Sequence, residues 1–370
     1  MMLLKCIYWF PMVVFVVLGC KDERFEIIEL DNVEFRENTV FNSYEDLTQP
    51  KFQNLIDKYQ LDTIFEGGED EFLRILMIKE WIHQTISIDN DGDPYPGNGY
   101  VEGILDAALE GVGFHCGHFM KVQNAIFNAY GYVSRPLGTG PGVSGVIDQH
   151  HGINETWVNS MGKWVLLDAK YNHYFEKNGI PLSVLEVRDE YLKNKAADID
   201  LIKGIDRVKM DYDPEFERSK ESFARTYTWV EYHINNNMFL SWPYFDSKLI
   251  VYEDDYFDNH VWMWEDHPHW AYNQPEFMVR EKNRNAIEWT PNTIASKVFI
   301  KDNIAKIKLH SNTPNFKSYQ IKVDSISQWM NVVSEVNIDL TKSEFDVSFR
   351  TLNLANVSGP VHRLIKRSKD

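Results

Sequence analysis

Two stretches of this chain decide its fold: residues 116–130, CGHFMKVQNAIFNAY, and residues 151–168, HGINETWVNSMGKWVLLD. Apolar side chains recur in the first stretch at helical spacing, and Gly131 then supplies a helix stop. In the second stretch, residues 155–158 and 163–167 alternate or are apolar around Ser160-Met161-Gly162, which predicts a hairpin. The chain thus passes from a helix to antiparallel strands, a pattern typical of the α+β class.

The flanking regions add a helix before these stretches and strands after them. Residues 69–86 carry apolar side chains at near-helical spacing, which predicts an amphipathic helix. Residues 89–99 predict a loop, and their three alternating aspartates invite a calcium site, although the spacing does not fit an EF-hand. Residues 138–145 predict a glycine-rich loop near a site, without the ending of a phosphate-binding loop. Short runs between residues 298 and 365 predict a β-sandwich of the immunoglobulin or fibronectin type.

The charge balance excludes some classes of partner. The 370 residues include 55 acidic and 38 basic side chains, and the net charge of −17 disfavours binding to nucleic acid or to a bare anionic membrane. With 44% hydrophobic residues, the chain can bury an ordinary core. Its three cysteines are too few for a disulfide framework or a four-cysteine zinc site. We therefore expect a folded protein that needs no cofactor.

The first two cysteines lie in a segment typical of export signals. Residues 6–18 are apolar but too few to span a bilayer, which takes about 20 residues, and they suit the core of a signal peptide. The ending VLGC at residues 17–20 resembles the lipobox of bacterial lipoproteins, and KDE at residues 21–23 resembles an export signal to the outer face of the outer membrane. The resemblance implies cleavage before Cys20, a lipid on Cys20, and a protein anchored in the outer membrane and exposed at the cell surface.

The third cysteine, Cys116, falls at the predicted N-terminus of a helix. Unpaired N–H groups and the helix dipole favour a thiolate there. His151 and Asp168 lie on opposite limbs of the predicted hairpin, which can bring them side by side while the helix presents Cys116 opposite. A cysteine nucleophile needs a base within hydrogen-bond reach and a third group that orients the imidazole. These three residues are therefore candidates for a catalytic triad.

The surrounding residues carry a family resemblance. The run GFHCG at residues 113–117, followed by AIF at 125–127 and GYVSR at 131–135, resembles the nucleophile helix and next strand of the transglutaminase-like superfamily. HGINETWV at residues 151–158 and GKWVLLD at 162–168 are similar to the family's histidine strand and its partner strand. The resemblance implies a papain-like core, with Cys116 as nucleophile, His151 as base and Asp168 as the orienting acid. It also implies an acyl-enzyme whose acyl group passes to water or to an amine.

Several alternatives stay open at this point. The family has Trp two residues after the histidine, whereas this chain has Ile153 there, so His150 competes with His151 for the role of base. The Cys116 N–H is one oxyanion donor, and Tyr100 is a candidate for the second. A zinc set of His115, Cys116, His118, His150 and His151 lacks any standard spacing, and we expect no metal. For Arg135 we favour a salt bridge at a strand end over substrate binding.

The second informative feature is aromatic. Residues 227–277 contain 15 Phe, Tyr or Trp, among them Trp262, Trp264 and Trp270 in the run WMWEDHPHW. Such rings can stack on sugars or line a cleft, but they more often fill a core.

Two functional hypotheses follow. The first is a surface lipoprotein with a transglutaminase-like cysteine site that acts on an amide or ester of an extracellular peptide: a peptidase, amidase or acyltransferase. The second is a lipoprotein of a polysaccharide utilisation system, in which Trp262, Trp264 and Trp270 bind a glycan substrate and the triad is repurposed or inert.

The expected organisation has five parts. Residues 1–19 form the signal peptide, and residues 20–67 form an N-terminal tether. Residues 68–215 form the transglutaminase-like α+β domain, with its nucleophile helix packed on an antiparallel sheet. Residues 216–290 form an aromatic-rich extension, and residues 291–370 form the β-sandwich.

Overall fold

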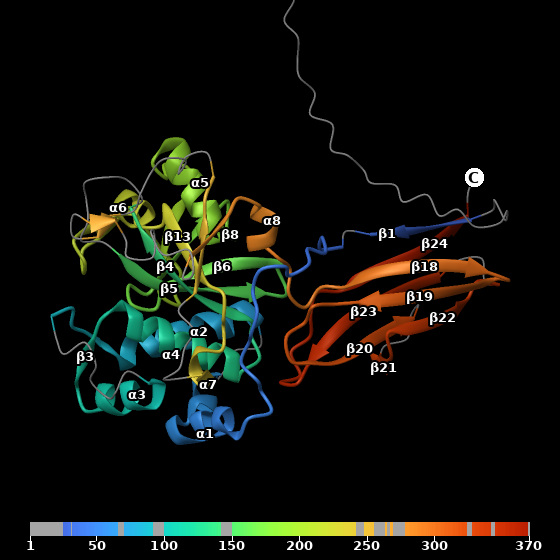
Figure 1. The fold of residues 1–370 in the computed structure, drawn as a ribbon, viewed down its shortest axis with the longest axis horizontal. Coiled ribbons are helices and arrows are strands. Elements are labelled where there is room, and N and C mark those ends of the chain that lie inside the picture. The colour runs from blue at the N-terminus through green and yellow to red at the C-terminus, as the bar shows by residue number, and fades with distance from the viewer. Residues whose placement is uncertain are drawn as a thin grey trace, which may run out of the picture.

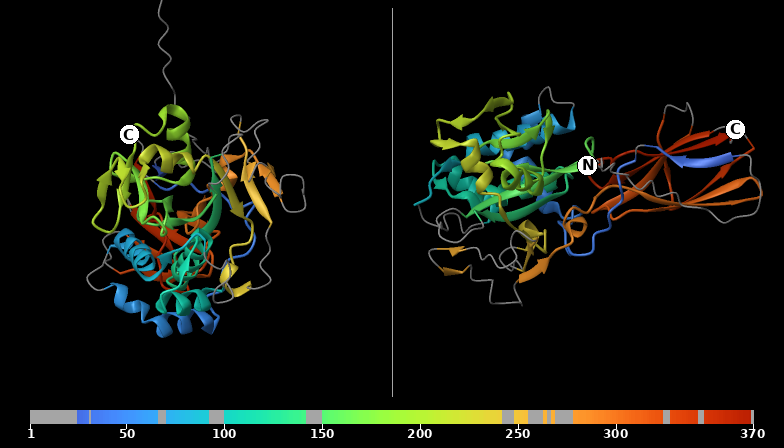
Figure 2. Two further views of the ribbon diagram at one scale, coloured as in Figure 1. Left: turned by 90° about the vertical axis from the view of Figure 1, so that its left-hand side faces the viewer. Right: turned by 90° about the horizontal axis from the view of Figure 1, so that it is seen from above.

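The computed structural model describes residues 25–30, 32–65, 70–91, 100–141, 150–241, 248–254, 263–264, 267–268, 278–323, 328–341 and 345–368. They form two units that lie end to end: a mixed unit of helices and sheets, and a unit built of strands, which we call the sandwich (Figures 1 and 2). The α+β class expected from the sequence is confirmed, with several antiparallel sheets. Among the described residues, no helix is long and apolar enough to cross a membrane.

The mixed unit is built around a six-stranded sheet with the order β17-β14-β13-β4-β5-β6. Its pairings are antiparallel except that of β14 with β17. The predicted hairpin is confirmed, since Trp157 pairs with Trp164 in the register of β5 with β6. The strands are β4 (Ser134–Gly140), β5 (His151–Val158), β6 (Lys163–Leu167), β13 (Trp229–His233), β14 (Leu249–Tyr252) and β17 (Met278–Glu281).

Helices cover both faces of this sheet (Figure 1). The core on one face joins α1 to α4 with Val165 and Leu167 of β6, and the core on the other face joins α5 and α6 with Trp164 and Leu166. The sheet is therefore buried on both sides, which matches its mostly apolar strands. The helices are α1 (Pro50–Tyr59), η1 (Leu61–Phe65), α2 (Glu71–Thr85), α3 (Val101–Leu109), α4 (Cys116–Ala129), α5 (Val184–Asn194), α6 (Lys220–Arg225), α7 (Met238–Ser241) and α8 (Arg284–Ile287).

Smaller sheets complete the mixed unit. A four-stranded sheet has the order β10-β9-β7-β8, and three two-stranded sheets join β2 with β3, β11 with β12, and β15 with β16. Their strands are β2 (Ser87–Ile88), β3 (Gly113–Phe114), β7 (His173–Lys177), β8 (Ile180–Pro181), β9 (Asp200–Lys203), β10 (Val208–Met210), β11 (Tyr212–Asp213), β12 (Arg218–Ser219), β15 (Met263–Trp264) and β16 (His267–Pro268).

The N-terminal segment differs from the expected tether. Strand β1 (Phe25–Glu29) pairs with β24 in the sandwich, and α1 places Phe52 and Leu55 in the same core as α4. Helix α1 buries only a few side chains, and polar residues lie between them, so its helical periodicity is weak in the sequence. The described residues of this segment therefore belong to both folded units.

The aromatic-rich segment also differs from the expected extension. Its strands β13, β14 and β17 form half of the six-stranded sheet, so the expected boundary after residue 215 falls inside one folded unit. Tyr227, Trp229, Tyr232 and Trp289 are fully buried. These described aromatic side chains belong to the core, which was one of the two expectations for the segment.

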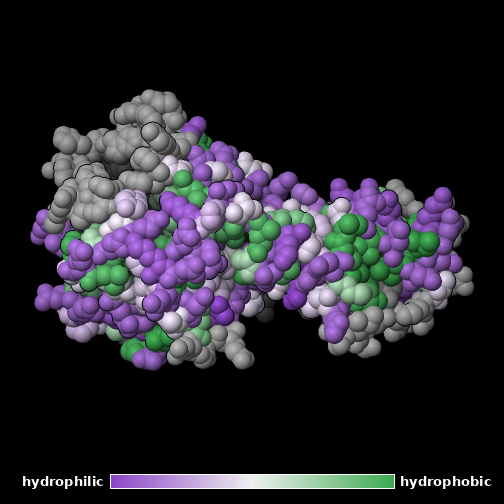
Figure 3. All heavy atoms as spheres, turned by 90° about the horizontal axis from the view of Figure 1, so that it is seen from below, coloured by the Kyte–Doolittle hydropathy of each residue, from purple (hydrophilic) through white to green (hydrophobic). Residues whose placement is uncertain are grey.

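The sandwich consists of two antiparallel sheets with a shared apolar core. One sheet has the order β1-β24-β23-β20-β21, and the other has the order β18-β19-β22. Hydrophobic residues also gather on the sandwich surface in Figure 3. The strands are β18 (Ala295–Lys301), β19 (Ile304–His310), β20 (Phe316–Val323), β21 (Met330–Val332), β22 (Glu335–Asp339), β23 (Phe345–Asn353) and β24 (His362–Ser368).

Buried polar contacts join the two units. The Asn353 amide donates to the carbonyl of Gly131 at 2.8 Å, and the Asn292 amide donates to Oδ1 of Asn159 at 2.9 Å. Gly131, the predicted helix stop, has a φ of +77°, and a Cβ there would lie 2.4 Å from Cβ of Ala355. The sandwich is therefore docked closely on the end of α4.

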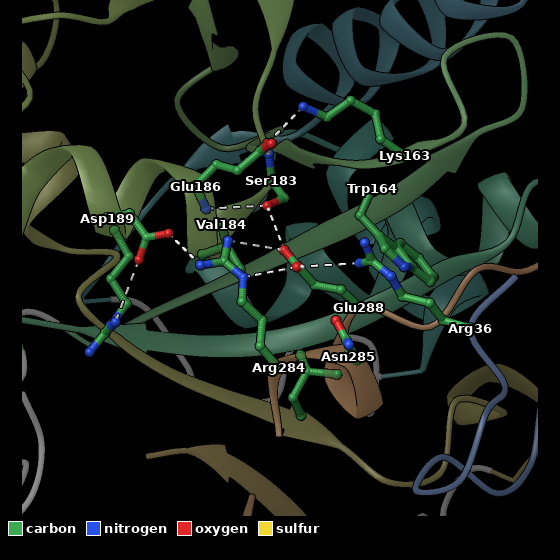
Figure 4. Close-up of polar contacts among 12 residues, drawn as sticks. Arg36, Lys163, Trp164, Ser183, Val184, Glu186, Asp189, Arg284, Asn285 and Glu288 are labelled. Atoms are coloured by element: carbon green, nitrogen blue, oxygen red, sulfur yellow. Dashed lines mark hydrogen bonds and ion pairs between the residues drawn. The ribbon is translucent and has the colours of Figure 1, made fainter. Parts of the chain in front are cut away.

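A network of ion pairs surrounds α8, just before the chain enters the sandwich (Figure 4). Arg284 of α8 pairs with Glu288 at 2.8 Å and with Asp189 of α5. Glu288 also accepts a hydrogen bond from Ser183 at 3.4 Å and lies 3.8 Å from Arg36 of the N-terminal segment. The network thus links α8, α5 and the N-terminal segment.

Candidate active site

Cys116 is the first residue of α4, and 6% of its surface is exposed. His115, the N-cap residue, has extended backbone angles, and its side chain accepts a hydrogen bond from the Gly117 N–H at 3.2 Å. The short strand β3 leads into this cap and pairs with β2. The thiol therefore lies beside the unpaired N–H groups of the first helical turn, where the helix dipole favours a thiolate.

Strand β5 passes close to the first turn of α4 and brings His151 to the thiol. His151 begins β5, is 4% exposed and hydrogen-bonds to the Cys116 side chain. A Cβ on Gly152 would lie 3.3 Å from Sδ of Met120 and 3.5 Å from Cα of Gly117. The two glycines thus allow an approach of strand and helix that larger side chains would hinder.

Asp168 follows β6 and holds the other side of the imidazole. Its Oδ2 lies 2.6 Å from Nε2 of His151, and both side chains are buried. Because Asp168 engages Nε2, Nδ1 is the ring nitrogen left for the thiol. The three residues expected to form a triad therefore lie together as a chain of hydrogen bonds.

Two further donors hold the Asp168 carboxylate. The Tyr171 N–H donates to Oδ1 at 3.1 Å, and the Tyr227 hydroxyl donates to Oδ2 at 3.0 Å. The Tyr227 oxygen also lies 2.8 Å from Nε2 of His173. Tyr227 is a site residue that the sequence did not single out, because it comes from the aromatic-rich segment and no motif connects it to Asp168.

Helix α4 also fixes the backbone on each side of Asp168. The Gln123 amide donates to the carbonyl of Leu167 at 3.2 Å, and its oxygen accepts from the Ala169 N–H at 3.2 Å. The same helix therefore carries Cys116 and fixes the backbone around Asp168. Gln123 was also missed in the sequence, where it reads as one polar residue among the apolar positions of the helix.

A buried lysine, Lys79, supports the turn after Asp168 through a hydrogen bond. Lys79 of α2 is fully buried and donates to Oδ1 of Asn172, whose amide donates to Glu80 at 2.8 Å. Burial lowers the pKa of Lys79 to about 7, although Glu80 and Asp168 oppose this shift. Asn172 has a φ of +56°, a conformation in which asparagine is tolerated. These contacts fix the turn between Asp168 and His173.

The charges of the triad stabilise one another. Burial alone raises the pKa of Cys116, but hydrogen bonds from His115 and His151 and the charge of His151 bring it well below its ordinary value. Burial lowers the pKa of His151, but Asp168 and Cys116 outweigh it and raise that pKa to about 9. The pKa of Asp168 is lowered in spite of its burial, chiefly by His151. All three shifts favour the ionised form of the site, with a thiolate, an imidazolium and a carboxylate.

The competing candidates occupy other positions. Of the two candidate bases, His151 is seen to bond to Asp168, at 2.6 Å. Arg135 forms the expected salt bridge, with Glu155 at 2.6 Å in the core. The His118 ring packs 4.1 Å from that of His115. Tyr100 precedes α3, where its carbonyl accepts from Ile104 at 2.9 Å, and no hydrogen bond to Cys116 is found among the described residues.

Some expected sites fall outside the described part of the chain. Cys20, Trp262 and Trp270 lie outside the described residues. Trp264 is described in its backbone only, as part of β15. The calcium candidate includes Asp93, which also lies outside the described residues. Within the described ranges, no group of three or more His, Cys, Asp or Glu side chains is arranged to hold a metal ion.

No model of a known protein family matches the sequence, and no curated protein matches it.

Proposed function

We propose that this protein is a cysteine hydrolase or acyltransferase that acts on an amide or ester through an acyl-enzyme on Cys116. The observation that carries the proposal is the buried chain from Cys116 through His151 to Asp168 at the N-terminus of α4. The transglutaminase-like resemblance supports it, because a helix with the nucleophile at its first turn packs on an antiparallel sheet that bears the base.

The charges in the site suit a two-step reaction. The Cys116 thiolate attacks the carbonyl carbon and forms a C–S bond, and the Cys116 N–H at the helix terminus hydrogen-bonds to the developing oxyanion. The His151 imidazolium gives its proton to the departing nitrogen or oxygen, and the C–N or C–O bond breaks.

Deacylation reverses the roles of these groups. Neutral His151 accepts a proton from an incoming water or amine, which attacks the thioester carbonyl. The C–S bond breaks, and the thiolate leaves beside a regenerated imidazolium. Asp168 keeps the imidazole in orientation and stabilises its charge in both steps.

Water is the acceptor that we propose. Surface anchoring through a lipid on Cys20 would place the site outside the cell, where water is abundant and no particular amine is implied. The glycan-handling alternative depends on Trp262, Trp264 and Trp270, and no contact among the described residues favours it.

The test is the alkylation of Cys116 by iodoacetamide across pH, with mass spectrometry to identify the modified residue. A thiolate held by His151 should react with a midpoint well below the free-cysteine value of about 8.5. Cys116→Ala should abolish labelling at this site and any hydrolysis of amide or ester substrates, while Cys116→Ser controls for the volume of the side chain. A labelling midpoint near 8.5 with hydrolysis unchanged in the alanine variant would contradict the proposal.

A further inference from the structure

Two cationic side chains meet beside the triad on the ring of Tyr171. Nζ of Lys170 lies 5.2 Å from the centre of that ring, and Cζ of Arg218 lies 5.5 Å from it. The Tyr171 ring in turn packs 4.9 Å from the imidazole of His151. Lys170 and Arg218 are therefore one aromatic ring away from the catalytic base. We call them the cation pair.

The polar partners of the cation pair are neutral. Lys170 donates to Oδ1 of Asn90 at 2.7 Å. Arg218 donates to the carbonyl of Ser222 at 2.9 Å and to the hydroxyl of Thr226 at 2.7 Å. Among the described residues, neither cation is joined to a carboxylate in a salt bridge. This is unusual for Lys170, which is 5% exposed, because buried cations are generally paired.

The negative charges near this pair already belong to the triad. Arg218 repels the Lys170 ammonium, and the groups that attract this ammonium are Cys116 and Asp168. Both of these groups also bond to His151. During acylation the thiolate becomes a neutral thioester and His151 gives up its proton, so these two charges disappear together. Lys170 and Arg218 are left without an anion of their own, and an anionic group on the substrate would supply one.

Resting on the function proposed above, we propose that Lys170 and Arg218 bind an anionic group of the acyl donor, such as a carboxylate close to the scissile carbonyl. The half-buried Arg218 is reachable from solvent. Its Nε and Nη2 donate to Ser222 and Thr226, so Nη1 is the end of the guanidinium that a carboxylate would contact. The preferred substrate class is therefore an acidic amide or ester, in a chain whose own net charge of −17 otherwise repels anions.

A pair of alkylating reagents tests this preference without knowledge of the substrate. Iodoacetate and iodoacetamide react with the same thiolate by the same displacement, and they differ in charge. The quantity measured is the ratio of their rate constants with Cys116 at pH 7. We expect Lys170→Gln and Arg218→Gln each to lower this ratio about fivefold, because the ratio cancels any change in the thiolate that both reagents share.

Matched variants show whether a change in the rate ratio comes from the cation pair or from the loss of any positive charge. Lys163→Gln removes a cation of β6 that is paired with Glu186 at 2.7 Å, and it should leave the ratio unchanged. Arg218→Lys keeps the charge and should retain most of the preference. A ratio that is the same in the parent, Lys170→Gln and Arg218→Gln overturns the assignment, whatever the absolute rates. The pH midpoint of the iodoacetamide reaction separately reports on the proposed nucleophile.

Discussion

Asp168 is the residue on which the polar contacts of the site converge. His151 at 2.6 Å, the Tyr227 hydroxyl and the Tyr171 N–H all bond to its buried carboxylate. A carboxylate with this many donors stays ionised in spite of burial, and its negative charge keeps His151 protonated. We therefore expect Asp168 to control the reactivity of Cys116 through the charge of the imidazole.

Asp168→Asn should separate this electrostatic role from simple orientation. Removal of the negative charge destabilises the imidazolium, so the pKa of His151 should fall from about 9 by about two units. The thiolate then loses its cationic neighbour, and the pKa of Cys116 should rise. An NMR titration of His151 and the pH profile of iodoacetamide labelling measure the two shifts.

The control for this change is Asp57→Asn, which alters an exposed carboxylate of α1. It should move neither titration. Titration midpoints in Asp168→Asn that equal those of the parent would show that the carboxylate does not set the charge state of the site.

At the residue scale, the sequence predicted the three residues of the site that belong to recurring motifs. Cys116, His151 and Asp168 are recognisable because their neighbours form a helix and a hairpin with characteristic spacing. Tyr227 and Gln123 act through hydrogen bonds to partners that are distant in sequence. Such contacts depend on how separate segments pack, so no local pattern indicates them.

Among the elements, the crossing of α4 and β5 decides whether the site forms. Gly117 and Gly152 meet at this crossing, and a Cβ on Gly152 would lie 3.3 Å from the flexible Met120 side chain. A glycine at position 152 therefore matters for the site, because the residue just before it, His151, is the one that bonds to Asp168.

Gly152→Val should push β5 away from α4 and separate His151 from the thiol. We expect the iodoacetamide rate at pH 6 to fall about tenfold or more, because displacements of about 1 Å are costly in such sites. Gly152→Ala is the matched control, since its single added carbon mainly meets the sulfur of Met120, which can move. Equal rates in the valine variant and the parent would contradict a role for this crossing.

Elements with strong periodicity were predicted, and those with short or mixed patterns were not. The helices α2 and α4 and the hairpin of β5 and β6 agree with their sequence patterns. Strand β24, which pairs with β1, and strand β4, which pairs with β13, lie far away from these partners in the chain, so the pairings cannot be predicted from local residues.

Across the whole molecule, the docking of the sandwich on the mixed unit links their stabilities. Asn353 is almost fully buried at this junction, where its amide donates to Gly131 and its oxygen accepts from the Val357 N–H at 2.9 Å. The Asn292 amide adds a second bond across the junction, to Asn159. We therefore expect the two units to unfold together.

Asn353→Ala removes the side chain that bridges the units and leaves the Gly131 carbonyl without this partner. The free energy of unfolding should fall by about 1 to 3 kcal/mol. In calorimetry we expect the single transition of the parent to broaden or split into two, because the coupling between the units weakens. Asn331→Ala, at an exposed position of β21, is the control. An unchanged transition in Asn353→Ala would show that the junction does not couple the units.

The pairing of β1 with β24 also determines how the molecule responds to mechanical force. The five register pairs run from Phe25 with Ser368 to Glu29 with Leu364, so β1 is joined to the sandwich along its whole length. A pull on the chain ahead of Phe25, along the strand axis, loads these pairs in shear and shares the force among their hydrogen bonds. The sandwich bears this load before the six-stranded sheet does. The β1–β24 pairing would therefore resist tension applied at the N-terminus, and the geometry around Cys116 would stay undistorted.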